Sequence, residues 1–209
     1  MSRYPGIRIG NGWGFEFAQF SSVEVCKIVG ISPALLRLWR SRGQVCGGGG
    51  KCGTFNSRET AELMIKFELS KHGVPPSESD EVSSAAAQIM LWFPLLNCDG
   101  ACEAIGCAKD ADNFIERFRA DDEVAARLTD KPKVREFLVK IGSGIPEFRK
   151  ELGPEMLEFA TARSFSVISL PKAAHDLAIA ARRPLFTVDV SGDTPEPMVR
   201  RLTGYRVAS

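Results

Sequence analysis

The sequence predicts a mainly helical protein of the α+β class, with an N-terminal unit of short helices and a helical C-terminal domain that holds a small β element. Three observations lead to this expectation. Between residues 20 and 73, short segments with apolar residues at helical spacing begin at capping residues and end at glycines. A break that contains prolines follows at 74–79. Segments in which apolar and polar residues alternate, as in a strand, occur only after residue 163. With 209 residues, 44% hydrophobic and 25% charged, the chain is long enough for a substantial core.

The first helix is expected to begin at Ser22. The segment Ser21-Ser22-Val23-Glu24 has the capping-box form, in which a serine hydroxyl and a glutamate three residues later satisfy backbone N–H groups reciprocally. Apolar residues then recur at helical spacing, and Gly30 supplies the left-handed residue that ends a helix.

A second helix is expected to follow directly and to run to about Arg42. Ser32 is a suitable N-cap, and Pro33 fits the first helical position because no N–H is needed there. Gly43 ends the helix. Two short helices joined by a tight glycine turn make a helix-turn-helix.

The next segment, 45–55, predicts a flexible β-hairpin, or wing. Four consecutive glycines, 47–50, lie between β-prone ends, with Lys51 beside the tip. Asn56 or Ser57 then caps a third helix that ends near His72 and Gly73.

The second helix separates an apolar side from a polar one when its residues are placed at 100° intervals. Leu35, Leu36 and Trp39 fall on one side, and the opposite side carries Ala34, Arg37, Arg40 and Ser41. An outward face with arginines suits the major groove of DNA, where guanidinium groups contact guanine edges or phosphates.

Charge is unevenly distributed along the chain. The overall net charge is +1, but residues 1–74 carry 10 Lys and Arg against 5 Asp and Glu, whereas the remaining 135 residues carry a net charge of −4. An anionic partner is therefore expected at the N-terminal part.

The segment Gly30–Gly43, GISPALLRLWRSRG, resembles the recognition segment of MerR-type winged helix-turn-helix proteins, and the similarity extends over about residues 20–73. The resemblance implies that Arg37 contacts DNA and that Trp39 packs beneath the helix. Excisionases and some phage terminase small subunits share this fold. The sequence departs from the family pattern at four positions: Ala34, Leu38, Arg40 and Thr54.

Elements of the C-terminal domain are less sharply marked. Residues 83–96 are apolar nearly all round, which favours a buried helix over a coiled-coil seam, and further helices are expected around 114–118, over 131–141 and over 155–163. Residues 164–170 and 185–190 are expected strands on either side of a helix that begins at Pro171, an order that permits a parallel βαβ unit.

Five regions result from these boundaries: an N-terminal arm (1–19), a MerR-like winged helix-turn-helix domain (20–74), a linker (75–82), a C-terminal domain for dimerisation, effector or partner binding (83–190) and a basic, irregular tail (191–209). The N-terminus lacks the continuous apolar stretch of a signal peptide, and no apolar run reaches bilayer length. We therefore expect a cytoplasmic protein with reduced thiols and no membrane contact.

Chemistry other than binding has little support in the sequence. Cys98, Cys102 and Cys107 could form a thiol site for a soft metal or for oxidation, although buried cysteines commonly serve as small apolar residues and the spacing matches no common zinc pattern. His72 and His175 have no identifiable catalytic partners, and no phosphate-binding glycine motif is present. We expect no enzymatic activity, no metal and no cofactor.

The sequence favours a homodimeric, sequence-specific transcriptional regulator that binds double-stranded DNA, with helix 33–42 in the major groove and wing 45–55 on the backbone. The alternative is a phage DNA-packaging or excisionase-like protein whose C-terminal domain binds another protein. A protein partner would be RNA polymerase for the regulator and a phage protein for the alternative. The expected DNA contacts are Ser32, Ala34, Arg37, Trp39, Arg40, Ser41, Arg42 and Lys51.

Overall fold

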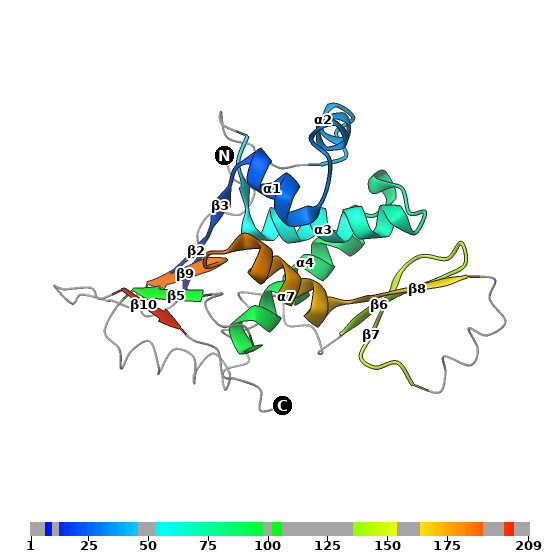
Figure 1. The fold of residues 1–209 in the computed structure, drawn as a ribbon. Helices are drawn as coiled ribbons and strands as arrows, with labels where there is room; N and C mark the ends of the chain where they lie inside the picture. Colours follow the sequence, from blue (N-terminus) through cyan, green and yellow to red (C-terminus); the bar gives the residue numbers. More distant parts are fainter. Residues whose placement is uncertain are drawn as a thin grey trace.

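The computed structural model describes residues 7–9, 13–45, 53–97, 102–105, 136–153, 164–189 and 199–202. Within these residues the protein is an α+β fold in which a group of helices lies between two small sheets (Figure 1). The α+β class is confirmed, but the strand content exceeds the mainly helical prediction because both chain ends contribute strands. None of the described helices is long and apolar enough to cross a bilayer.

The first two helices form where the capping signals predict them. Helix α1 (Ser22–Val29) begins with the complete capping box of Ser21 and Glu24 and ends at Gly30, whose φ is +75°. Helix α2 (Pro33–Ser41) is capped by Ser32, whose hydroxyl oxygen accepts a hydrogen bond from the Leu35 N–H at 3.2 Å.

Helix α3 (Ser57–Lys71) follows a two-residue strand. Strand β4 (Phe55–Asn56) pairs antiparallel with β3 (Gln19–Phe20), so that Phe55 lies opposite Phe20. Asn56 then caps α3 in a second capping box, in which its side chain accepts from the Glu59 N–H and the Glu59 carboxylate accepts from the Asn56 N–H, each at 2.8 Å. Of the two predicted caps, Asn56 and Ser57, the structure has Asn56, and Ser57 is the first residue of the helix.

The predicted linker 75–82 contains secondary structure. It holds the 3-10 helix η1 (Pro76–Glu78) and the first residues of helix α4 (Asp80–Asn97), which packs against α3. Residues 86, 87, 89, 90 and 91 of α4 are buried, which confirms the predicted buried helix. Helix α7 (Leu170–Ala181) packs against both α4 and α1.

The larger sheet has five strands in the order β1-β2-β9-β5-β10. Strands β5 and β9 are parallel, and every other neighbouring pair is antiparallel. These strands are β1 (Ile7–Ile9), β2 (Trp13–Phe17), β5 (Cys102–Ile105), β9 (Phe186–Asp189) and β10 (Val199–Leu202). The predicted N-terminal arm thus supplies two strands, and the expectation of an irregular tail is wrong for residues 199–202, which gain a partner in β5.

The second sheet has three antiparallel strands in the order β7-β6-β8: β6 (Phe137–Ile141), β7 (Glu147–Arg149) and β8 (Phe165–Ser169). The helix predicted over 131–141 is therefore wrong for residues 137–141. Their apolar positions also fit helical spacing, and pairing with strands on both sides decides in favour of a strand.

The predicted βαβ unit is also wrong. Strands β8 and β9 flank α7 in the chain but belong to different sheets, because β8 pairs with β6 and β9 pairs with β2 and β5. Helix α7 packs on α4 and α1 rather than crossing one sheet. The helices predicted around 114–118 and over 155–163 lie outside the described residues.

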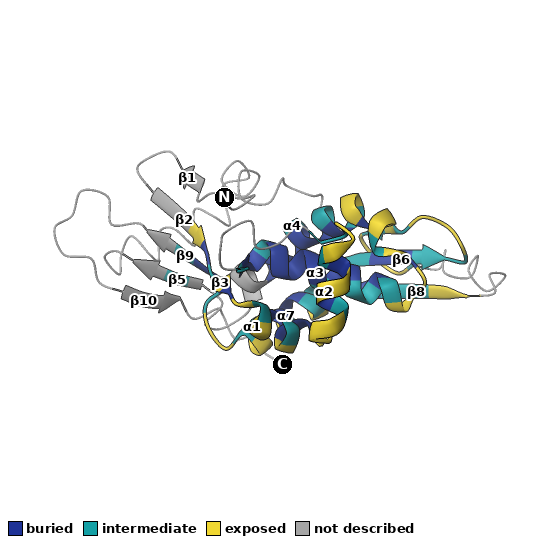
Figure 2. Ribbon diagram, turned by 90° about the horizontal axis from the view of Figure 1, so that it is seen from above, coloured by how far each residue is buried: buried dark blue, intermediate teal, exposed yellow. Residues whose placement is uncertain are grey.

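One hydrophobic core joins the N-terminal helices to the C-terminal half. The buried cluster includes Phe20, Val25 and Phe55 from the first part of the chain and Leu170, Leu177 and Phe186 from the last part. Buried residues gather where α3, α4 and α7 meet, as the dark blue parts of these helices in Figure 2 show. The first two helices are thus supported by residues more than 100 positions away in the sequence.

Replacing Leu177 by alanine should lower the free energy of unfolding by about 2–5 kcal/mol, because Leu177 is fully buried between α7 and its neighbours. The Ile179→Ala variant is the matched control, since Ile179 lies on the same helix and is 59% exposed, and its effect should stay within about 0.5 kcal/mol. Urea unfolding measures both values. Similar losses for the two variants would contradict the burial of Leu177 in the core.

Candidate nucleic-acid interface

Helix α2 stands at the outer edge of the molecule, beyond α1 and α3 (Figure 1). Its inner side is fixed by Leu36 and Trp39, which are 2% and 5% exposed. The Trp39 ring meets the Phe67 ring of α3 edge to face, with centroids 6.2 Å apart. The tryptophan that the family resemblance places beneath the helix is therefore buried, and its ring is not on the outward surface.

The outward side of α2 carries a continuous exposed stripe. Ala34, Arg37, Leu38 and Ser41 are all exposed and follow the i, i+3, i+4, i+7 spacing of one helix face. We call these four residues the outer stripe. Ser32 and Arg42, also predicted as DNA contacts, are exposed at the two ends of the helix.

Arg40 differs from Arg37, although the sequence predicted both on the outward face. The Arg40 side chain is half-buried on the flank of α2, with its guanidinium carbon 4.5 Å from the centroid of the Phe55 ring. Its Nη2 donates to the Gly53 carbonyl oxygen at 3.3 Å, and the Ser22 hydroxyl donates to the same oxygen at 2.8 Å. Arg40 therefore holds the chain at Gly53, and Arg37 alone of the two projects into solvent.

The conformation at Gly53 favours glycine. Its φ is +62°, in the left-handed region, and a Cβ there would lie 3.6 Å from the Ser22 hydroxyl oxygen and 3.7 Å from Arg40 Nη1. The segment 46–52, which contains the glycine run and Lys51 of the predicted wing, lies outside the described residues. The chain that leaves this segment is fixed at Gly53 by α1 and α2.

The chain that enters the same segment is fixed by a buried lysine. Lys66 of α3 is 3% exposed, and its ammonium donates to the Gln44 carbonyl oxygen at 2.9 Å. The same ammonium pairs with the Asp80 carboxylate and lies 3.8 Å from the Glu62 carboxylate. These oxygens replace the water that would otherwise solvate the buried charge. Through the same contacts, Lys66 of α3 joins the chain that follows α2 to the start of α4.

The sequence around α2 is strongly basic. From Lys27 to Arg58 there are six basic residues and no acidic one. Among the described members of this set, Lys27, Arg37 and Arg42 are exposed. Positive charge without acidic neighbours in the sequence therefore surrounds α2.

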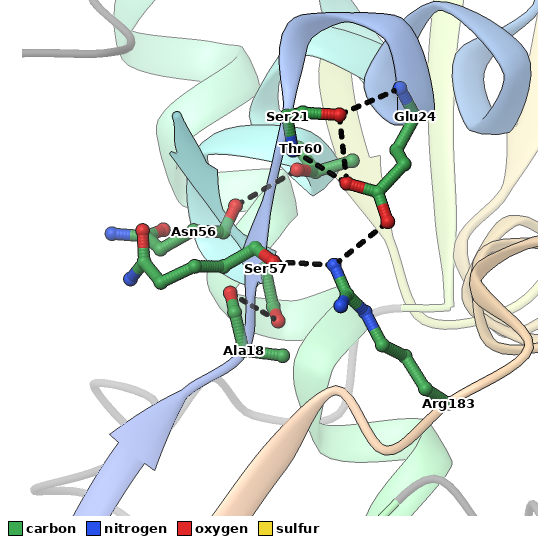
Figure 3. Close-up of polar contacts among 8 residues, drawn as sticks. Ala18, Ser21, Glu24, Asn56, Ser57, Thr60 and Arg183 are labelled. Carbon is green, nitrogen blue, oxygen red and sulfur yellow. Dashed lines mark hydrogen bonds and ion pairs between the residues drawn. The ribbon is translucent and has the colours of Figure 1, made fainter. Parts of the chain in front are cut away.

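An ion-pair network ties the start of α1 to the C-terminal half (Figure 3). Arg183, which follows α7, lies 3.2 Å from the Glu24 carboxylate, donates to the Gln19 carbonyl oxygen and stacks over the Phe20 ring at 4.4 Å. Hydrogen bonds from the backbone N–H and hydroxyl of Ser21 lower the pKa of Glu24, and the charge of Arg183 adds to the effect.

The predicted thiol site is not described as a whole. Cys98 and Cys107 lie outside the described residues, and Cys102 belongs to β5. Burial raises the pKa of the Cys26 thiol on α1, with Arg40 and Arg37 opposing the shift, so this thiol is protonated at neutral pH. The described part of the chain contains no group of three His, Cys, Asp or Glu residues that could hold a metal ion.

A scan against protein-family models finds no match to this chain, and a search of curated proteins finds no relative. Function must therefore be inferred from the residues of the chain. Of the residues at this face, sequence reasoning left Leu38 unassigned, although its spacing from Ala34 and Ser41 would have placed it on the outer stripe. It also missed Ser22 and Gly53, whose contacts join distant positions and leave no local signal.

Replacing Arg40 by alanine should lower the free energy of unfolding by about 1–3 kcal/mol, because the variant loses a charged hydrogen bond to Gly53 and the contact with Phe55. Arg37→Ala is the control on the same helix and should change stability by less than about 0.5 kcal/mol. Thermal or urea unfolding compares the two. Equal effects would show that the two arginines do not have separate roles.

Glu24 should contribute a pH-dependent part of the stability. Because its pKa is lowered from 4.5 on folding, the carboxylate stabilises the folded state above pH 4.5, and this contribution disappears as pH falls through the lower folded value. The loss of stability in Glu24→Gln should therefore be larger at pH 7 than near pH 2, as measured by urea unfolding. A pH-independent difference would contradict the assigned contacts.

Proposed function

We propose that this protein is a sequence-specific DNA-binding transcriptional regulator of MerR-like type that places α2 in the major groove. The carrying observation is the separation of the two sides of α2: Leu36 and Trp39 are buried in the core, while Arg37 lies on an exposed stripe. A helix held in this way presents a fixed set of side chains to base edges, since the groove admits one α-helix. The basic segment 27–58 supports an anionic ligand at the same surface.

The segment between Gln44 and Gly53 would contact the DNA backbone as the wing, with Lys51 near a phosphate. Anchoring of both ends, by Lys66 at Gln44 and by Arg40 and Ser22 at Gly53, supports this role because it fixes where the segment leaves and rejoins the helices. We further propose a cytoplasmic homodimer. One short helix reads too few base pairs for specificity, and two copies would read two half-sites.

Arg37→Ala should weaken binding to a selected DNA site by about 1–3 kcal/mol, because Arg37 is the charged member of the exposed stripe. Gel shifts with sites selected from random DNA measure the loss, with circular dichroism confirming the fold. Lys172→Ala, which removes one exposed positive charge from α7, is the control and should leave affinity unchanged.

Unchanged specific binding by Arg37→Ala would refute the role of α2. Binding without any sequence preference in the wild-type protein would instead favour DNA recruitment, as in the packaging or excisionase-like alternative.

A further inference from the structure

The outer stripe has an unusual chemical composition for a base-reading surface. Two of its members, Ala34 and Leu38, are apolar, and Leu38 is 42% exposed. The Ser41 hydroxyl donates to the Leu38 carbonyl oxygen of its own helix at 2.9 Å. Arg37 is therefore the stripe member with hydrogen-bond donors directed to solvent, and within the described part of the chain it forms no ion pair.

The four bases offer different groups in the major groove. Guanine offers two acceptors that match a guanidinium, and thymine offers a methyl group that matches an apolar side chain. Adenine is read best by the amide of Asn or Gln, and cytosine by a carboxylate. The outer stripe contains one guanidinium, two apolar side chains, no amide and no carboxylate.

We infer that the outer stripe selects a guanine next to thymine, with Arg37 on the guanine edge and with Ala34 and Leu38 against thymine methyl groups. Ala34 and Leu38 are i, i+4 neighbours, so their side chains form one apolar patch on α2. Arg37 lies three residues after Ala34 on the same exposed side of α2, which places the guanidinium beside that patch. This inference rests on the proposed DNA binding by α2, and it specifies which base pairs α2 would select.

An exposed leucine alone does not require a ligand, because single apolar residues are common on protein surfaces. The test must therefore separate a leucine that touches a methyl group from a leucine that touches only water. Replacing thymine by uracil removes the C5-methyl group and leaves base pairing unchanged, so it isolates that one contact.

The experiment begins with selection of binding sites from random DNA by the full-length protein. Each thymine of the selected half-site is then replaced by uracil, one at a time, and affinities are measured for the wild type and for Leu38→Ala. A methyl group buried against an apolar side chain corresponds to a roughly fourfold change in affinity. We expect the wild type to lose about fourfold at one or more thymines beside a guanine, and Leu38→Ala to lose this discrimination at one of them.

The matched control is Val23→Ala. Val23 is an apolar residue of the neighbouring helix α1 and is 65% exposed, so its removal should leave the uracil effect unchanged. Leu38 and Val23 both lie at the surface, and circular dichroism verifies that both variants fold.

The possible results separate the inference from the proposed function on which it depends. A selected site in which neither guanine nor thymine is preferred, or a uracil effect of equal size in the wild type and Leu38→Ala, overturns the base assignment while DNA binding stands. Absence of any selected site overturns both. Loss of the methyl effect in Leu38→Ala, with its retention in Val23→Ala, supports the assignment.

Discussion

The surroundings of α2 depend on the pairing of Phe20 with Phe55. These two buried rings belong to β3 and β4, so the pair joins the chain that enters α1 to the chain that enters α3. Each ring is covered by a guanidinium: Arg40 of α2 lies over Phe55, and Arg183 of the C-terminal half lies over Phe20. Cation–π contacts contribute about 0.5–1 kcal/mol each when the cation is exposed, as Arg183 is, and more when the cation loses its solvation. Their position lets two distant segments converge on one strand pair.

This convergence explains why α2 can have an exposed, ordered face. Helix α2 has only nine residues, and an isolated helix of that length is not stable in water. Its order comes from Leu36 and Trp39 on the inner side, from the Ser32 cap and Pro33 at its start, and from contacts that fix Gln44 and Gly53 beyond its end. None of these contacts uses Ala34, Arg37 or the side chain of Leu38, which leaves the outer stripe free for a ligand.

The elements that could be predicted from the sequence are those whose signals are local. Ser21 and Glu24, Ser32 and Pro33, and Asn56 each act within four residues of the helix that they begin, and helices α1, α2 and α3 start at or next to the positions that these residues predict. The strands could not be placed in this way because their partners are remote: β2 pairs with β9, and β10 becomes a strand through β5. Similarly, a helical projection correctly gives the direction of Arg37 but cannot show that Gly53 and Phe55 draw Arg40 aside.

The shared core has a consequence for how this fold can be divided. A fragment ending near Val74 would retain α1, α2 and α3 but would uncover the sides of Phe20, Val25 and the α3 residues that α4, α7 and the β9 region cover in the intact chain. Two buried polar groups would also each lose one partner, since the Ser57 hydroxyl donates to the Leu185 carbonyl oxygen and Lys66 pairs with Asp80. The N-terminal helices are therefore not an autonomous cassette that gene fusion or excision could transfer unchanged. The order of α1, α2 and α3 therefore depends on the second half of the chain.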